Sequence, residues 1–314
     1  MAVRKNLVLP PPTASDSSTE HADWLELKAL ASADQNSSFA DLVAEFRRSG
    51  TLDASNDPLD QKGEKSQELA DAAMAELDAR SRVCGPNYPF GVNDQVLQLH
   101  DQESLYTPYI FMLLLKAFGV HAGTPVVKGA SHFEELAAVV AREYLGGESR
   151  GAQSVHFGFP RRLGPSGFTD AVEDLCKRLG EGGGSRVGPK RKDQKDAKLD
   201  IVAWRPFPDE QVGKLIAFGQ CAAGDNWDGK VSELRPVSFT GLWLKDRRLS
   251  FTPLVFFYVP RCFEAWEWEY VASFSDTIPF DRCRISHLLT SDVLPEDLKK
   301  RTTTWVKSVM RRLT

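Results

Sequence analysis

The sequence predicts an α/β domain with a mixed central sheet, preceded by a mainly helical region. From about residue 155 onward, strand-like apolar runs alternate with amphipathic helical patterns, an order that is typical of α/β folds. The strongest strand-like run is LSFTPLVFFYV at 249–259. In the first 150 residues, apolar residues recur mostly at three- and four-residue spacings, which indicates helices.

The N-terminal half is expected to contain a flexible arm and several helices. Residues 1–20 are rich in Pro, Ser and Thr, which favours a flexible arm, and 50–66 is predicted to be a polar loop. Helical periodicity covers 22–46, 69–83, 106–118 and 133–145. No catalytic constellation is evident there, so we interpret residues 21–150 as a region for binding a partner or forming oligomers.

The second half alternates between helices and strands. Thr169 is a candidate cap for a helix that ends at the glycines 180–184. Further strands are expected at 199–204, 214–221, 249–259 and 278–285, with helical segments at 225–234, 263–274 and 296–313.

Two of these strands carry polar residues that a hydrophobic core alone does not explain. Asp200 interrupts the first apolar strand, and Gln220 ends the second. The Pro-rich turn RPFPDEQ between them predicts a hairpin, which would place both residues on adjacent strands facing one cavity. Two oxygen donors at the end of a buried hairpin suit a hard divalent cation such as Mg²⁺.

This arrangement resembles the PD-(D/E)XK nuclease superfamily, in which an acidic helix, a strand with Asp and a strand with Glu or Gln follow one another. The Gln-x-Lys variant is used by some anti-phage DNA nucleases, and the matching residues are Asp200 and Gln220. The resemblance implies a restriction-endonuclease-like fold for 151–314. It also implies endodeoxyribonuclease activity with Mg²⁺ or Mn²⁺, in defence against foreign DNA and with a defence-system partner protein.

The family often carries a Glu that supports the metal on the helix before the Asp strand. Glu173 is the candidate here, together with Asp200 and Gln220 as metal ligands. The alternative for Glu173 is a solvated carboxylate that pairs with Lys177, four residues further along the same helix.

The chain departs from the family pattern at Ala222, where the resemblance implies a catalytic lysine. Period 2 puts residues 220 and 222 on the same face of the strand, but a methyl group supplies neither charge nor proton transfer. Either the chain is a pseudo-nuclease or a lysine has been replaced by alanine. We favour replacement, because Asp200 and Gln220 are both present. The alternative function is a non-catalytic module that binds nucleic acid or protein.

A basic run lies between the Glu173 helix and the hairpin. We predict that these residues contact the DNA backbone, with a solvated loop as the alternative. The residues are Arg186, Lys190, Arg191, Lys192 and Lys195. The net charge of −4 argues against a protein that coats nucleic acid, so any DNA contact must be a local patch.

The remaining features narrow the class of protein. No apolar run is long enough to span a membrane and no secretory signal is evident, so a cytoplasmic protein is expected. Five cysteines without a CxxC pair argue against a disulfide framework and against a structural zinc site. Because one nuclease site cuts one strand, a symmetric dimer is expected.

Overall fold

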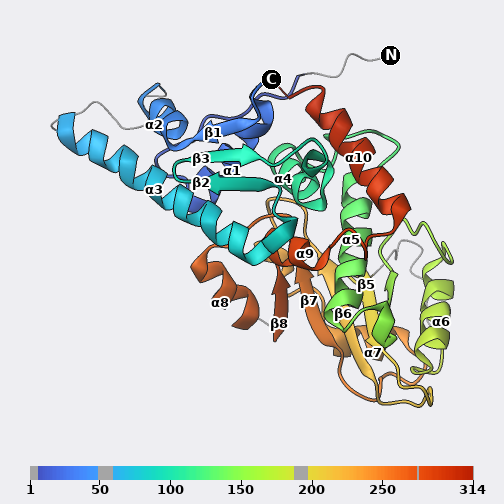
Figure 1. Cartoon of the computed structure of the whole chain (residues 1–314). Coiled ribbons are helices and arrows are strands. Elements are labelled where there is room, and N and C mark those ends of the chain that lie inside the picture. The colour runs from blue at the N-terminus through green and yellow to red at the C-terminus, as the bar shows by residue number, and fades with distance from the viewer. Residues whose placement is uncertain (1–5, 49–58, 187–196, 274–275, 314) are drawn as a thin grey trace. The chain divides into compact units, whose positions relative to one another are not determined.

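The computed structural model describes residues 6–48, 59–186, 197–273 and 276–313, with only the backbone for 59–62 (Figure 1). The chain forms two compact units. Unit 1 consists of residues 1–127 and 299–314, and unit 2 consists of residues 128–298. The sequence placed the boundary at 150/151, which is too late, because the helix at 129–144 packs against the sheet of unit 2.

Unit 1 combines helices with a small antiparallel sheet of strand order β1-β3-β2. Its elements are α1 (Ser18–Ala31), β1 (Asn36–Ser38), α2 (Phe39–Arg48), α3 (Leu59–Cys84), η1 (Gly85–Asn87), β2 (Phe90–Asn93), β3 (Val96–Leu99), η2 (Ser104–Tyr106), α4 (Pro108–Phe118) and most of α10 (Glu296–Met310). The predicted helices are confirmed. The sheet was missed because strands of three or four residues are too short to show period 2.

The first residues of unit 1 were expected to be a flexible arm. Residues 1–5 lie outside the described residues, but the Leu7 N–H donates to the Arg312 carbonyl at 2.7 Å. Ser17 and Glu20 then form a reciprocal capping box at the start of α1, which satisfies backbone N–H groups that a helix N-terminus leaves without partners. The polar loop expected at 50–66 ends earlier, since α3 begins at Leu59.

A buried arginine organises the interior of unit 1. Arg80 of α3 is 2% exposed. Its guanidinium donates to Asp23 at 2.8 Å, to Glu26 at 3.0 Å and to Glu76 at 2.9 Å. The hydroxyl groups of two tyrosines donate to the other oxygen of Glu26, from Tyr88 at 2.7 Å and Tyr109 at 2.6 Å. This network ties α1 to α3 and α4.

Unit 2 is built on a five-stranded mixed sheet of order β4-β5-β6-β7-β8. β4, β5 and β6 pair antiparallel, and β6, β7 and β8 pair parallel. Its elements are α5 (Gly129–Tyr144), η3 (Glu148–Arg150), β4 (Gln153–His156), α6 (Phe168–Leu179), β5 (Ile201–Arg205), β6 (Leu215–Cys221), η4 (Asp228–Lys230), α7 (Pro236–Trp243), β7 (Leu254–Tyr258), α8 (Ala265–Ser273), β8 (Thr277–Phe280) and α9 (Arg282–Leu288). The predicted α/β class with a mixed central sheet is confirmed.

Several details of unit 2 differ from the sequence prediction. Thr169 does not cap α6, since the helix begins at Phe168 with Gly167 at the N-cap position and no side-chain capping hydrogen bond. Strand β4 lies in a Gly- and Pro-rich stretch in which no strand was expected. The strand expected at 278–285 ends at Phe280, because the Asp281 side chain accepts a hydrogen bond from the Arg284 N–H at 2.8 Å and caps α9.

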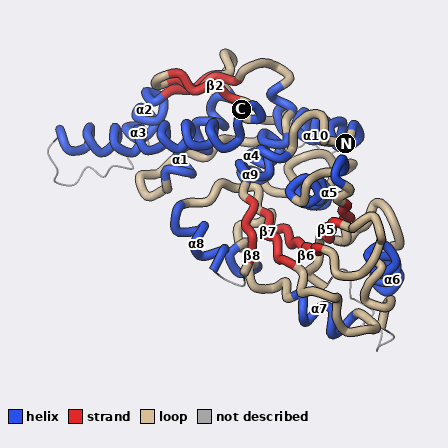
Figure 2. Tube along the Cα trace, turned by 60° about the horizontal axis from the view of Figure 1, so that its bottom comes forward, coloured by secondary structure: helices blue, strands red, loops and turns tan. Residues whose placement is uncertain are grey.

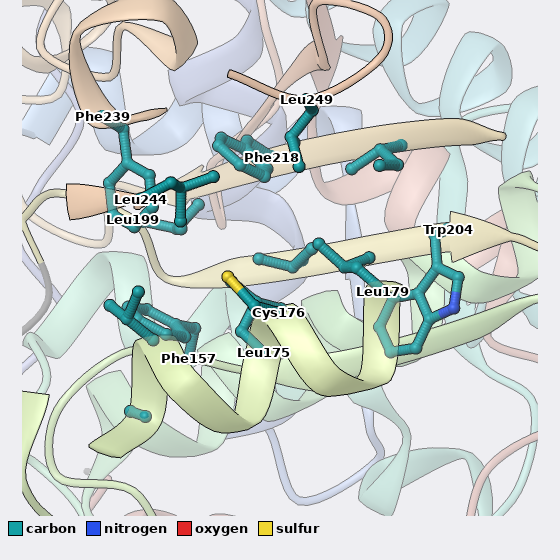
Figure 3. Close-up of a cluster of buried hydrophobic side chains, with 14 of the residues drawn as sticks. Phe157, Leu175, Cys176, Leu179, Leu199, Trp204, Phe218, Phe239, Leu244 and Leu249 are labelled. Carbon is teal, nitrogen blue, oxygen red and sulfur yellow. The ribbon is translucent and has the colours of Figure 1, made fainter. Parts of the chain in front are cut away.

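Helices cover both faces of the sheet. Successive strand residues point to opposite faces. Val202, Trp204 and Phe218 pack with Leu175 of α6 and Phe239 of α7 in one hydrophobic cluster, part of which is shown in Figure 3. On the opposite face α5 packs against β4, β5 and β6. Figure 2 shows α5 and α7 on the two sides of the sheet.

The apolar stretches of the chain form the buried hydrophobic cores of the two units. Among the described residues, no helix combines the length and the apolar character required to cross a membrane.

The Arg80 network yields a prediction about stability. Arg80→Ala leaves the buried carboxylates of Asp23 and Glu26 without their cation, so the free energy of unfolding should fall by about 3–5 kcal/mol. Urea denaturation followed by circular dichroism measures this change. Arg82→Ala is the control, since Arg82 is exposed on the same helix and its loss should cost less than about 0.5 kcal/mol. Equal effects of the two substitutions would contradict the role of Arg80.

Candidate functional site

The hairpin formed by β5 and β6 places the two predicted metal ligands on adjacent strands. Ile201 is paired with Gly219, and the Asp200 N–H donates to the Gly219 carbonyl at 2.9 Å. Continuing this register by one residue places Asp200 opposite Gln220. Residues directly opposite in an antiparallel pair lie on the same face of the sheet.

Asp200 is fixed by hydrogen bonds from both sides. One carboxylate oxygen, Oδ2, accepts from the Cys221 N–H at 2.8 Å. Its backbone carbonyl accepts from the N–H groups of Phe157 at 2.7 Å and Gly158 at 2.9 Å, in the segment after β4. The carboxylate therefore has a defined direction at the point where β4, β5 and β6 meet.

Two side chains that the sequence analysis did not select lie beside Asp200. A Cβ atom on Gly158 would lie 2.6 Å from Glu134 Oε2, 3.0 Å from His156 Nε2 and 3.2 Å from Asp200 Oδ1. The three atoms therefore flank the α-carbon of Gly158, although among the described residues they are not a group whose ligand atoms all lie within 4.8 Å of one another. Glu134 Oε2 and His156 Nε2 are themselves 2.6 Å apart. We call Glu134, His156 and Asp200 the acidic cluster.

Gln220 forms a second group of contacts. Its side chain is 4% exposed, and Nε2 donates to Glu233 Oε2 at 3.0 Å. Lys198 Nζ lies 3.1 Å from the same oxygen. Gln220 Oε1 is buried and accepts no hydrogen bond from any residue that the structure describes. A buried amide oxygen in this condition loses its hydration without compensation, so a cation bound to it would stabilise the site.

Ala222 lies in an apolar environment. It is 1% exposed and belongs to a hydrophobic cluster with Trp227, Phe257 and Phe263. Its N–H donates to the Tyr258 carbonyl at 2.9 Å, which continues the pairing with β7. A lysine at this position would have to extend its aliphatic stem past these aromatic rings before its ammonium reached the ligand oxygens.

The structure does not bring Glu173 to this site. Glu173 lies on α6, and its Oε2 accepts from the Ser185 N–H at 2.8 Å. The sequence analysis selected the helix directly before the Asp strand. Because β4 was not recognised, α5 was not considered, although α5 carries Glu134, whose carboxylate contacts His156 and lies on the same side of Gly158 as Asp200.

Of the five basic residues predicted to contact nucleic acid, only Arg186 lies within the described residues. Arg186 donates through its N–H to the Trp243 carbonyl at 2.8 Å and through Nη1 to the Gly241 carbonyl at 3.2 Å, next to α7. These contacts hold Arg186 against the protein surface. The other four residues, Lys190, Arg191, Lys192 and Lys195, lie outside the described residues.

Cys221 lies next to Asp200, whose Oδ2 accepts from the Cys221 N–H. Burial raises the pKa of the Cys221 thiol well above its ordinary value, and the Asp200 and Glu134 carboxylates raise it further. The thiolate is the reactive form of cysteine, so Cys221 is poorly suited to act as a nucleophile near neutral pH.

We compared the chain with known proteins. No protein-family model, curated protein or solved structure matches it.

The environment of Cys221 yields a testable prediction. Alkylation of Cys221 by iodoacetamide should be slow at neutral pH and should accelerate only at alkaline pH. Glu134→Gln removes one negative charge, so the pKa of Cys221 should fall and the rate at a fixed pH should rise. Peptide mass spectrometry identifies which cysteine is alkylated and so measures the rate at Cys221.

Glu135→Gln is the matched control, because Glu135 is the next residue on α5 but pairs with Arg162 at 3.2 Å. It should leave the alkylation profile unchanged. Identical profiles for wild type and Glu134→Gln would show that Glu134 does not act on Cys221.

Proposed function

We propose that this chain is a metal-dependent nuclease of the PD-(D/E)XK type that acts on DNA, with Mg²⁺ or Mn²⁺ bound by Asp200, Gln220 and Glu134. The observation that carries the proposal is the buried Gln220 Oε1, which accepts no hydrogen bond from described residues and belongs to a residue opposite Asp200 in the register. A divalent cation is a ligand that would satisfy this oxygen.

The order of elements supports the proposal. A helix with Glu134 is followed by β4, by α6, by β5 with Asp200 directly before it, and by β6 with Gln220. This is the order of acidic helix, Asp strand and Gln strand on which the family resemblance rests. A five-stranded mixed sheet with helices on both faces is compatible with a restriction-endonuclease-like fold.

The available donor atoms fit the proposed metal. Carboxylates of Asp200 and Glu134 and the amide oxygen of Gln220 are hard ligands of the kind that Mg²⁺ binds. His156 Nε2, beside both carboxylates, is a nitrogen donor that suits Mn²⁺ as well. The gathering of two carboxylates at one point is electrostatically unfavourable by itself, and a divalent cation would offset their repulsion.

The residues of the site have separate roles in the proposed phosphodiester hydrolysis. When bound, the metal would neutralise charge on the scissile phosphate and orient water. Asp200 is fixed by the Cys221 N–H through Oδ2, and its Oδ1 lies on the side of Gly158. Glu134 Oε2 lies 2.6 Å from His156 Nε2 and so orients the imidazole. Ala222 contributes no catalytic group.

One observation favours the second candidate function, a non-catalytic module that binds nucleic acid or protein. Ala222 is enclosed by the aromatic side chains of Trp227, Phe257 and Phe263. An alanine that fits its apolar surroundings is compatible with a site that has no catalytic lysine. Defence against foreign DNA and a defence-system partner belong to the nuclease proposal, and they rest on the resemblance to the Gln-x-Lys variant.

Measurements of metal affinity show whether α5, through Glu134, or α6, through Glu173, supplies the carboxylate ligand. Glu134→Gln should weaken Mn²⁺ binding at least about tenfold, equivalent to about 1.4 kcal/mol, whereas Glu173→Gln should not change it. Asp200→Asn and Gln220→Met should also weaken binding, because each removes an oxygen ligand or its charge. Isothermal titration calorimetry with MnCl₂ measures the affinities. Weakening by Glu173→Gln alone would assign the ligand to α6.

Cleavage tests the role of position 222. A missing proton-transfer group lowers rates by about 10²–10⁴-fold, so the chain with Ala222 should be nearly inactive. Ala222→Lys should restore Mg²⁺-dependent cleavage of labelled duplex DNA, and adding Asp200→Ala should abolish it.

Ala222→Met is the control for size, since methionine matches the length of a lysine stem without its charge. It should bind metal and cleave no better than the chain with Ala222. If a folded, metal-binding Ala222→Lys protein cleaves neither duplex nor single-stranded DNA, the binding module replaces the nuclease as the better proposal.

A further inference from the structure

Three buried side chains that can bind metal meet at the carboxyl ends of β7 and β8. Cys262 lies in the segment after β7, and Asp281 and Cys283 lie directly after β8, at the start of α9. Their ligand atoms all lie within 4.8 Å of one another. All three residues are buried, with 4% exposure for Cys262 and Asp281 and 5% for Cys283. The three residues take no part in the acidic cluster.

The separation of the two sulfur atoms fits a shared zinc ion. Zinc–sulfur bonds of about 2.3 Å at a tetrahedral angle place two thiolate sulfurs about 3.8 Å apart. Cys262 Sγ and Cys283 Sγ are 3.6 Å apart. A disulfide bond of about 2.05 Å would instead require the sulfurs to approach each other by about 1.5 Å. The geometry therefore suits a metal with little movement of either side chain.

The charges around the cluster also balance with zinc bound. Two thiolates and one carboxylate carry three negative charges. A bound zinc ion neutralises two of them, so the cluster keeps a net charge of −1. Arg282 is fully buried, and its Nη2 donates to Cys262 Sγ at 3.2 Å, so the guanidinium offsets the remaining charge. The Arg284 N–H donates to Asp281 Oδ1 at 2.8 Å, which orients the carboxylate as outer hydrogen bonds orient metal ligands.

We propose that Cys262, Asp281 and Cys283 bind a zinc ion that joins the segment after β7 to α9. Two thiolates select zinc over Mg²⁺, so this site is chemically distinct from the proposed oxygen-rich site at Asp200. Three protein ligands leave the fourth tetrahedral position to a small ligand such as water. The proposal concerns the folding of unit 2 and does not depend on nuclease activity.

The test is the zinc content of the full-length protein after incubation with one equivalent of ZnCl₂ and gel filtration. Inductively coupled plasma mass spectrometry should find about one zinc per chain. Cys262→Ser, Cys283→Ser and Asp281→Asn should each lower this value to well below one. Asparagine can still cap α9, so Asp281→Asn isolates the loss of the carboxylate charge. Titration with Cd²⁺ should produce a sulfur-to-metal charge-transfer absorption in wild type.

Cys176→Ser is the matched control, because Cys176 is a thiol of unit 2 with the same 5% exposure as Cys283 but packs in the hydrophobic cluster under α6. It should retain zinc and the Cd²⁺ absorption. Wild-type protein that binds no zinc and gives no Cd²⁺ absorption overturns the proposal. Zinc retention by the double variant Cys262→Ser, Cys283→Ser overturns it as well, as does a disulfide between these cysteines in protein purified with zinc present.

Discussion

The antiparallel register of β5 and β6 is the constraint on which the candidate site depends. Ile201 faces Gly219, and this pairing puts Asp200 opposite Gln220. A shift of one residue would move each side chain of β6 to the other face of the sheet and separate the two ligands. Gly219 helps to fix this register. A Cβ atom there would lie 3.0 Å from the Tyr258 ring and 3.1 Å from Ile201 Cβ, which is tighter than ordinary contact.

Around this register, one face of the sheet combines a hydrophobic core with polar groups at the strand ends. The face under α6 and α7 is a large hydrophobic cluster that includes Val202, Trp204 and Phe218, and its burial stabilises the sheet. By period 2, Asp200 and Gln220 belong to this same face at the end of the strands, and Asp200 Oδ1 lies near Gly158, as do Glu134 Oε2 and His156 Nε2 from the side of α5. The apolar cluster holds the backbone in place, so the polar groups can be kept close together despite their like charges.

Charged groups are buried in both units, and in each case other groups offset the cost of burial. In unit 1, Arg80 is surrounded by three carboxylates and a carbonyl oxygen, so the buried cation is paired on several sides. In unit 2, Arg282 contacts the sulfur of Cys262 beside Asp281. Gln220 Oε1 is a buried acceptor for which the described residues offer no hydrogen-bond donor, and a bound cation would satisfy it.

The sequence by itself determined the elements whose signals are local. The apolar runs before and after RPFPDEQ predicted β5 and β6, and the polar residues Asp200 and Gln220 within them predicted a site at the end of the hairpin. The stripe at 133–145 predicted α5. The positions of these elements along the chain follow from hydrophobic periodicity and turn residues, which involve only near neighbours in sequence.

Only the tertiary structure decided which distant residues meet. Glu134, His156 and Asp200 are far apart in sequence and come together because α5 packs across β4, β5 and β6, so no spacing in the chain encodes their contact. Glu173 was chosen for its proximity in sequence, yet its carboxylate accepts from the Ser185 N–H. Cys262 and Cys283 lack any metal-binding spacing and become neighbours through the parallel pairing of β7 and β8. Strand pairing and helix packing decide such contacts, since they join segments that the local pattern treats as independent.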